Sequence, residues 1–371
     1  MKKLLLIIPL LIWVACEDDK ELDCAGVEDG DNICGCTDVS ALNYDSEATF
    51  DDGSCQYIFF NTYHGSDQDH GESVQQTTDG GYIVLGYTGC SDNCEVWLIK
   101  TDINGNVEWK QSFGGNGYDY GYSVQQTTDG GYIIFATTTS FSGNGLWLIK
   151  TDSNGNEEWN KLFAGSEAYS GQQTSDGGYI ITGNISIGGY DVLLIKTDSE
   201  GNEEWHKIFS IAEDGTDTGR SVKQTSDGGY IITGYTSVDS YLDAFLIKTD
   251  INGNEEWHQT YGDNGYDRGE SVQQTTDGGY IIFGESGDSP ALFKTDSQGQ
   301  EQWRKILEGS RATSGQQTID GGYIVTGSSG AEIGVFLIKT DSNGNEIWKR
   351  IFGSSSWGSS VQQTSDGGYV I

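Results

Sequence analysis

The chain has 371 residues, and its 56 acidic and 20 basic side chains give a formal net charge of −36. A field of this sign repels phosphate backbones and anionic membrane surfaces, so it excludes nucleic-acid binding and unaided attraction to membranes. The length is compatible with one large repeat domain.

The N-terminal segment has the organisation of an export signal. Lys2 and Lys3 precede an apolar run, LLLIIPLLIWV, that is too short to be a stable transmembrane span. The run ends at Ala15 and Cys16, and this end resembles the lipobox of bacterial lipoproteins, in which the cysteine is lipidated. The resemblance implies that residues 1–15 are a lipoprotein signal peptide and that the membrane is contacted only through the lipid anchor.

The EDDKE run after the cysteine resembles the acidic surface-export tag of Bacteroidota-type lipoproteins. This resemblance implies an exported outer-membrane lipoprotein displayed at the cell surface. An acidic run after a signal can equally be a solvated tether.

Residues 16–56 form an acidic module that contains four further cysteines. An even number of cysteines in an exported chain favours disulfides over metal or redox chemistry. Three connectivities are open for the four, and we prefer Cys24–Cys34 with Cys36–Cys55. The segment resembles a small cysteine module of exported proteins from the same bacterial group. Two more cysteines bracket a later loop and are expected to pair as Cys90–Cys94.

The module also carries enough carboxylate and amide oxygens to bind calcium, the one cofactor that the sequence leaves open. The candidate ligands are Asp38, Asn43, Asp45, Asp51 and Asp52. Their spacing differs from that of the EF-hand loop, and the alternative is a disulfide-stapled linker without metal.

Residues 57–371 are a tandem array. Seven DGGY motifs lie 43 to 51 residues apart, with their tyrosines at Tyr82, Tyr132, Tyr179, Tyr230, Tyr280, Tyr323 and Tyr369. A second motif, KTD-x-x-G-x-x-x-W, recurs in step with the first and ends at Trp109, Trp159, Trp205, Trp257, Trp303 and Trp348. Each copy has four β-rich runs, A to D, exemplified by SVKQT, GYIITGY, DAFLIKT and EEWHQTY. The A–B and C–D links are short and rich in Asp, Asn and Gly, which predicts hairpins.

The apolar pattern of the strands predicts how the copies assemble. Strands B and C are apolar on both faces, so neighbouring sheets must cover them, whereas strand A carries a glutamine pair that suits a wet central channel. Four-stranded units of this length stack radially into a β-propeller. The order of motifs resembles the kelch-type propellers and the QTSDGGYI repeats of secreted bacterial proteins, although here the Gly-Gly precedes strand B. The expected fold is an all-β propeller of four-stranded antiparallel blades.

The ends of the array set the expected blade count. Phe59 and Tyr63 occupy the Trp and Tyr places of a D strand, and the chain stops within a B strand at Ile371. We therefore expect about seven blades, with the last one incomplete because its C strand is missing, or a truncated chain. Closure of the ring by strands from both termini would remove exposed sheet edges.

Two turn motifs recur at the same end of each blade. We hypothesise a ring of contacts between the KTD lysine and the DGG aspartate, such as Lys100 with Asp79, each weakly stabilising as a surface pair. The alternating oxygens of the C–D turn resemble a calcium loop, but its glycine is at the position that a hairpin needs.

The B–C and D–A links vary in length and chemistry, and they share the other face because consecutive strands are antiparallel. Loops on a rigid scaffold are where recognition usually lies, and aromatic rings beside charges suit sugar rings or a protein partner. The alternative is that these aromatics pack between blades. The candidate ligand-binding residues are Tyr118, Asp119, Tyr120, Tyr266, Asp267, Arg268 and Trp357.

Catalysis has little support in the sequence, because its four histidines and abundant carboxylates form no distinct nucleophile–base set. We expect a surface-anchored exported lipoprotein whose propeller binds a glycan or a protein without catalysis. The alternatives are a carbohydrate-active enzyme or its accessory domain, and a purely structural spacer.

Overall fold

The computed structural model describes residues 23, 25–27, 30–35, 37, 45–51, 60–65, 68–91, 93–141, 145–212, 215–238, 241–262, 265–330, 334–353 and 356–371. The predicted signal peptide, the lipidation site and several module residues lie outside these ranges: 1–15, Cys16, Cys24, Cys36, Cys55, Asp38, Asn43 and Asp52. The chain divides into two compact units, Met1–Thr62 and Tyr63–Ile371. The described part of the chain contains no helix of a length and hydropathy that would span a membrane.

The first unit contains one parallel strand pair, β1 (Cys34–Gly35) with β2 (Phe50–Asp51). Asp23 organises the preceding turn, because its carboxylate accepts hydrogen bonds from the Val27 amide at 2.8 Å and the Asn32 side chain at 2.6 Å. The Val27 bond is the main cause that lowers the pKa of Asp23. Cys34 is disulfide-bonded to a partner outside the described residues, so the preferred Cys24–Cys34 pairing stays a prediction.

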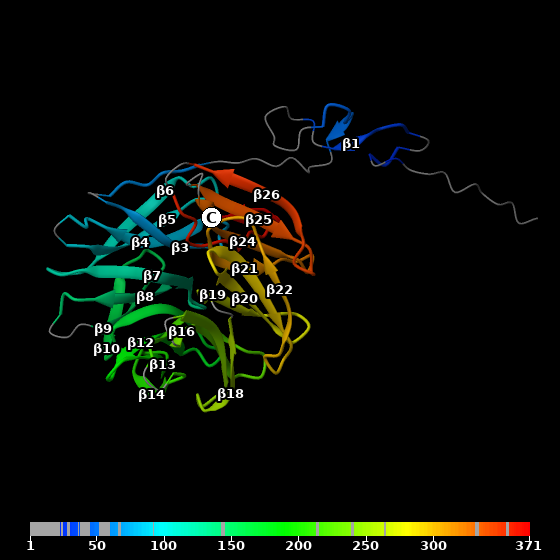
Figure 1. Cartoon of the computed structure of the whole chain (residues 1–371). Coiled ribbons are helices and arrows are strands. Elements are labelled where there is room, and N and C mark those ends of the chain that lie inside the picture. The colour runs from blue at the N-terminus through cyan, green and yellow to red at the C-terminus, as the bar shows by residue number, and fades with distance from the viewer. Residues whose placement is uncertain are drawn as a thin grey trace, which may run out of the picture. The chain divides into compact units, whose positions relative to one another are not determined.

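The second unit is built of six four-stranded antiparallel sheets, each in the order A-B-C-D (Figure 1). The first three blades comprise β3 (His70–Gln76), β4 (Tyr82–Thr88), β5 (Glu95–Thr101) and β6 (Val107–Phe113); β7 (Asp119–Gln126), β8 (Tyr132–Thr138), β9 (Gly145–Thr151) and β10 (Glu157–Phe163); and β11 (Glu167–Gln173), β12 (Tyr179–Ser186), β13 (Tyr190–Thr197) and β14 (Glu203–Phe209). The next three comprise β15 (Asp217–Gln224), β16 (Tyr230–Val238), β17 (Tyr241–Thr249) and β18 (Glu255–Tyr261); β19 (Asp267–Gln274), β20 (Tyr280–Ser286), β21 (Ser289–Thr295) and β22 (Glu301–Ile306); and β23 (Arg311–Gln317), β24 (Tyr323–Ser328), β25 (Val335–Thr340) and β26 (Glu346–Phe352).

The expectation of about seven blades is corrected to six complete blades. The seventh position of the ring holds a two-stranded pair, β27 (Gln362–Gln363) with β28 (Tyr369–Val370), and the described residues supply it with no C or D strand. Tyr63, which was expected in a D strand, lies outside any strand. Its hydroxyl nevertheless donates to the Gly105 carbonyl at 2.9 Å, as the D-strand Tyr261 does to Gly299 at 2.6 Å.

The two recurrent aromatics pack blade against blade. The DGGY tyrosines from Tyr132 to Tyr323 are almost completely buried, and each contacts the D-strand tryptophan of the preceding blade with ring centroids 5.8–6.0 Å apart. Trp348 makes the same contact with Tyr369 and so attaches β28 to the last complete blade. Between these contacts, the B and C strands of adjacent sheets bury their aliphatic side chains, as predicted.

Hydrogen bonds between side chains and backbone amides join neighbouring blades around the central axis and so close the ring. In each A strand, the side-chain oxygen of the last glutamine accepts a hydrogen bond from a backbone amide in the A–B turn of the preceding blade, at 2.8–3.0 Å. These bonds occur at all seven inner strands, including that from Ser365 to Gln76, which joins residues 289 positions apart. The hairpin β27–β28 therefore completes the circle although its blade is short.

The predicted lysine–aspartate ring is confirmed, but its lysines are not surface residues. In six blades the KTD lysine ammonium lies 2.9 Å from the DGG aspartate, and the lysine side chain is almost completely buried. Lys248, for example, also donates to the Thr249 carbonyl at 2.8 Å and contacts Glu256 at 3.0 Å. Each of the six ammonium groups is thus a buried donor to an aspartate and a backbone carbonyl, and in four blades also to a D-strand glutamate, so its removal should cost more than that of an exposed pair.

The DGG sequence follows from this contact. The first glycine, Gly228, adopts a φ of +86°, which favours glycine. At the second, Gly229, a Cβ atom would lie 2.1 Å from the Thr249 carbonyl oxygen and 2.7 Å from the Lys248 ammonium. The turn therefore needs glycine twice, for two different reasons.

Candidate binding face and central channel

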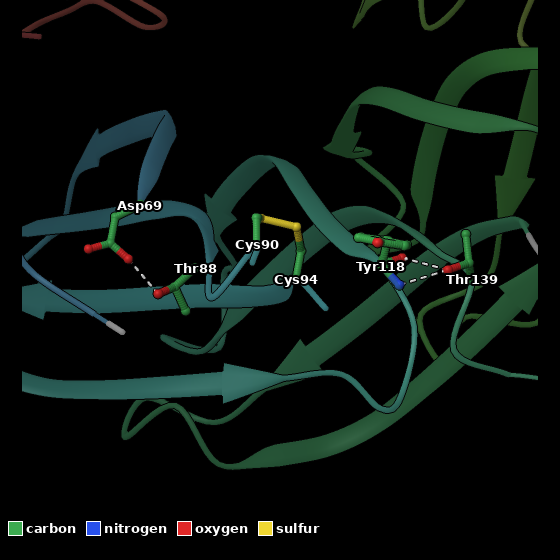
Figure 2. The surroundings of a disulfide bond; sticks show 6 residues. All are labelled: Asp69, Thr88, Cys90, Cys94, Tyr118 and Thr139. Atoms are coloured by element: carbon green, nitrogen blue, oxygen red, sulfur yellow. Dashed lines mark hydrogen bonds between the residues drawn. A yellow bond between two sulfur atoms is a disulfide. The ribbon is translucent and has the colours of Figure 1, made fainter. Parts of the chain in front are cut away.

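The D–A and B–C loops lie together on one face, as predicted, and we call it the variable face. Tyr118 of a D–A loop pairs with Cys94 in the B–C loop of its own blade and with Thr139 in the B–C loop of the next. Figure 2 shows this junction beside the Cys90–Cys94 disulfide, which confirms the predicted pairing. Parallel bridges between Tyr190 and Thr216 and between Leu242 and Tyr266 repeat the junction in later blades.

Two predicted site residues, Asp119 and Asp267, are buried rather than exposed. Asp119 accepts hydrogen bonds from the Gly115 amide at 3.0 Å and the Ser140 hydroxyl at 2.6 Å. Asp267 lies 3.6 Å from the Arg304 guanidinium. Asp119 thus contacts its own D–A loop, at the place where Asp69 contacts Thr88 (Figure 2), whereas Asp267 lies beside the D strand of its blade.

The predicted aromatic residues are on the surface of the variable face. Tyr118, Tyr266 and Trp357 expose 46%, 51% and 69% of their area. Tyr120 lies parallel to Tyr118 at 6.4 Å and meets Tyr87 edge-on at 4.9 Å. Tyr118, Tyr266 and Trp357 are therefore accessible to a ligand, whereas half-buried Tyr120 packs between two blades, as the alternative expected.

The tyrosines continue inward as a row. Tyr120 is 6.4 Å from Tyr122, and Tyr122 is 5.5 Å from Tyr169. Tyr169 is covered by the Arg220 guanidinium at 4.2 Å from its ring centroid, which is a cation–π contact. The row leads from the exposed loop to a central channel of about 780 Å³ that is lined by the A strands.

An ion cluster occupies the channel mouth, where each A strand begins. Arg220 donates to Glu270 at 2.9 Å, and Arg311 contacts the other oxygen of the same carboxylate. The cluster continues through Glu285, which is 4.0 Å from Arg311 and 3.1 Å from the predicted site residue Arg268. Five charges of alternating sign from three blades thus meet at one rim.

The pKa values of the carboxyl groups at this mouth are shifted in different directions. Burial tends to raise the pKa of Glu270, but the charges of Arg220 and Arg311 outweigh it and lower the pKa. Burial raises the pKa of Glu285 despite its arginine neighbours. Burial also raises the pKa of Glu72, another residue of the mouth, against the attraction of Arg220.

The sequence analysis named residues of the variable-face loops but not the A-strand side chains at the channel mouth. The residues it missed are Glu72, Tyr122, Tyr169, Arg220 and Glu270, which line the cavity three positions before the first glutamine position of each A strand. A usable signal was present, because this position changes from copy to copy while the serine after it is constant. In the first unit, only Asp45 and Asp51 of the calcium candidates are described, and the described residues contain no cluster of potential metal ligands.

No protein-family model and no curated protein sequence matches the chain. Among solved structures, Sqt1 from Chaetomium thermophilum is similar with a TM-score of 0.50 and 11% identity, over 80% of this chain and 75% of that one. Sqt1 bound to the N-terminus of the ribosomal protein L10 matches with a TM-score of 0.50 and 11% identity, over 80% and 78%. A protein of unknown function from Dyadobacter fermentans has a TM-score of 0.49 and 12% identity, over 76% and 94%. Such identities show only that the chain shares the propeller fold.

Proposed function

We propose that the protein is a binding propeller that holds a segment of a partner protein at the channel mouth of its variable face. The observation that carries this proposal is the tyrosine row that runs from exposed Tyr118 to Arg220, where it meets the ion cluster. Tyrosine and arginine dominate protein-recognition hot spots, because they combine large contact area with directional hydrogen bonds. Arg220 and Arg311 are already held by Glu270, so their side chains lose little conformational entropy when a partner binds.

The setting in which this binding would occur comes from the sequence. The apolar N-terminal run, its lipobox-like end at Cys16 and the acidic run after it support the proposal of an outer-membrane lipoprotein of the kelch-like bacterial type, tethered at the cell surface. A propeller of similar fold, Sqt1, is bound to a protein N-terminus in its crystal structure, which supports a protein segment as the occupant here.

The test is a selection of immobilised propeller against a displayed peptide library, with a glycan array as the parallel arm. The double variant Tyr118→Ala/Tyr266→Ala should weaken a selected peptide by roughly tenfold or more, because two exposed rings would be lost. Ile319→Ala is the matched control, because Ile319 is 86% exposed on the opposite, A–B turn face. Retention of glycans alone, or equal binding by the double variant, would overturn the proposal.

A carbohydrate-active enzyme is the second candidate, and one observation favours it. Glu72 and Glu270 line the same mouth with pKa values shifted in opposite directions, which is the pattern of an acid and a base. Both oxygens of Glu270 are, however, engaged by arginines, which makes it a poor base. Release of reducing sugar from a polysaccharide panel, abolished by Glu72→Gln, would establish the enzyme instead.

A further inference from the structure

Below the mouth, the channel is encircled by the first glutamine of each pair. Six of seven A strands carry this glutamine, and Lys223 takes its place in the seventh. The register confirms the equivalence, because Lys223 pairs with Ile231 as Gln75 pairs with Ile83. The six glutamines are Gln75, Gln125, Gln172, Gln273, Gln316 and Gln362, and all seven side chains line the cavity.

The hydrogen bonds of these glutamines fix the direction of their amide groups. Each side-chain oxygen accepts from the backbone amide of the second glutamine in the next ring position, at 2.7–3.1 Å. A backbone amide only donates, so the atom that meets it must be the oxygen and not the nitrogen. The six NH₂ groups are left without a protein acceptor among the described residues, and each belongs to a side chain that lines the channel.

Lys223 interrupts this series of bonds. An ammonium group only donates, so it cannot accept from the Gln274 amide as the glutamines do at the equivalent places. In the described part of the chain Lys223 makes no hydrogen bond or ion pair, although it is one of three cations that line the cavity. The other two, Arg220 and Arg311, are paired with Glu270. Burial lowers the pKa of Lys223, as expected for a charge without a partner.

We infer that this ring of six amide NH₂ groups and the Lys223 ammonium is a binding site for a small anion, either an inorganic oxyanion or a carboxylate group. The charges that line the channel are three cations and two carboxylates, so the channel is locally positive in a chain of net charge −36. Charge-assisted bonds from several donors to one anion are the strong kind. A cavity of about 780 Å³ leaves ample room for such an ion.

This site does not depend on the proposed partner, because it uses other residues at another depth of the channel. The chain itself supplies the best variant, since Lys223→Gln restores the residue found in the other six copies and should fold. The matched control is Lys161→Gln, which removes a lysine of the outer strand β10 whose ammonium contacts Asn202 in a C–D turn.

Binding is measured by titration calorimetry in chloride-free buffer, with sulfate and acetate as separate titrants at constant ionic strength. We expect one site per chain for at least one anion, a loss of roughly tenfold or more in affinity for Lys223→Gln, and no change for Lys161→Gln. Uptake of protons on binding at pH 9, seen in buffers of different ionisation enthalpy, would tie the anion to the ammonium.

The two titrants identify the source of the anion. Binding of sulfate alone points to an inorganic oxyanion, and binding of acetate points to the carboxylate of a larger ligand. Absence of binding for both anions, or equal affinity in wild type and Lys223→Gln, overturns the inference. An unchanged or raised melting temperature of Lys223→Gln without anion shows that the variant is folded.

Discussion

The two faces of the propeller differ in how much their turns vary from blade to blade. On the face formed by the A–B and C–D turns, which we call the constant face, each complete blade repeats one solution: two glycines, a buried lysine and an aspartate 2.9 Å from it. On the variable face, loops are joined by local bridges that leave their side chains free to differ. The constant face therefore holds the ring together, and the variable face can change without loss of the fold.

The largest expected effect is that of a methyl group in the constant turn. Gly229→Ala should destabilise the protein by about 3 kcal/mol or more, because the new Cβ meets backbone oxygen at 2.1 Å. Gly188→Ala is the control on the variable face, where φ is +84° but nothing lies within 4 Å. It should cost only about 1 kcal/mol from backbone strain. Urea unfolding compares the two, and equal losses would refute the difference between the faces.

The second prediction concerns the buried lysines. Lys248→Met should cost about 1–3 kcal/mol, because three acceptors lose a buried charged donor. Lys207→Met is the control, since its ammonium contacts only the Asn254 side chain, at 2.9 Å, and should change stability by less than about 0.5 kcal/mol. Thermal unfolding of the two variants measures this difference in stability. A Lys248 variant as stable as the control would mean that the ammonium is no more than a surface charge.

The third prediction tests the variable face at the B–C loop that the Cys90–Cys94 disulfide closes. The Cys90–Cys94 disulfide closes a loop with a sequence separation of 4. Such a short loop restricts the unfolded chain little, so Cys90→Ser/Cys94→Ser should cost less than about 2 kcal/mol. Protection of the other blades in hydrogen exchange should be unchanged. Loss of protection in distant blades would show that this face, too, stabilises the whole ring.

The smallest effect at neutral pH is that of a single turn aspartate, but it grows in acid. Burial of Asp227 is outweighed by hydrogen bonds from Thr225, Lys248 and the Gly229 amide, which lower its pKa to about 2. A lowered carboxyl pKa contributes stability above the unfolded value of 3.8, and this contribution is lost as the pH falls through about 2.

Asp227→Asn should cost only about 0.5–1 kcal/mol at pH 7, since the aspartate is largely exposed. It should make the melting temperature fall less steeply between about pH 4 and pH 2. Asp288→Asn, which removes an exposed carboxylate of the variable face, is the matched control. If the melting temperatures of both variants fall equally steeply with pH, the turn aspartates do not contribute to the loss of stability in acid.

Much of the constant face could be predicted from the repeated residues. The spacing of tyrosines and tryptophans predicted blades that pack in sequence, and the KTD and DGG motifs predicted the lysine–aspartate contact. The burial of those lysines was missed. Each lies at the end of the apolar run of strand C, where a charged residue usually marks the point at which a strand reaches solvent. The blade count was also too high, because one hairpin and Tyr63 occupy a position that motif counting assigns to a blade.

The binding face was predicted only in part. Tyr118, Tyr266 and Trp357 are exposed on the variable face, since loops and their aromatics can be recognised along the chain, but their role in binding stays a prediction. Asp119 and Asp267 were expected beside a ligand, yet both are buried, Asp119 against its own loop and Asp267 near Arg304 of β22. Nothing in a linear motif shows whether a carboxylate at a loop end faces solvent or the backbone amides of that loop.

The repeat, the strand pattern and the turn contacts can be read along the chain, because these depend on residues within one copy or in the next copy. Which side chains meet at the central axis becomes visible in the folded ring alone. Arg220, Glu270 and Arg311 are 41 and 50 residues apart, and Lys223 completes a ring of amides drawn from seven strands. Such groups converge only when the circle closes, so neither the ion cluster nor the anion site exists in any single copy.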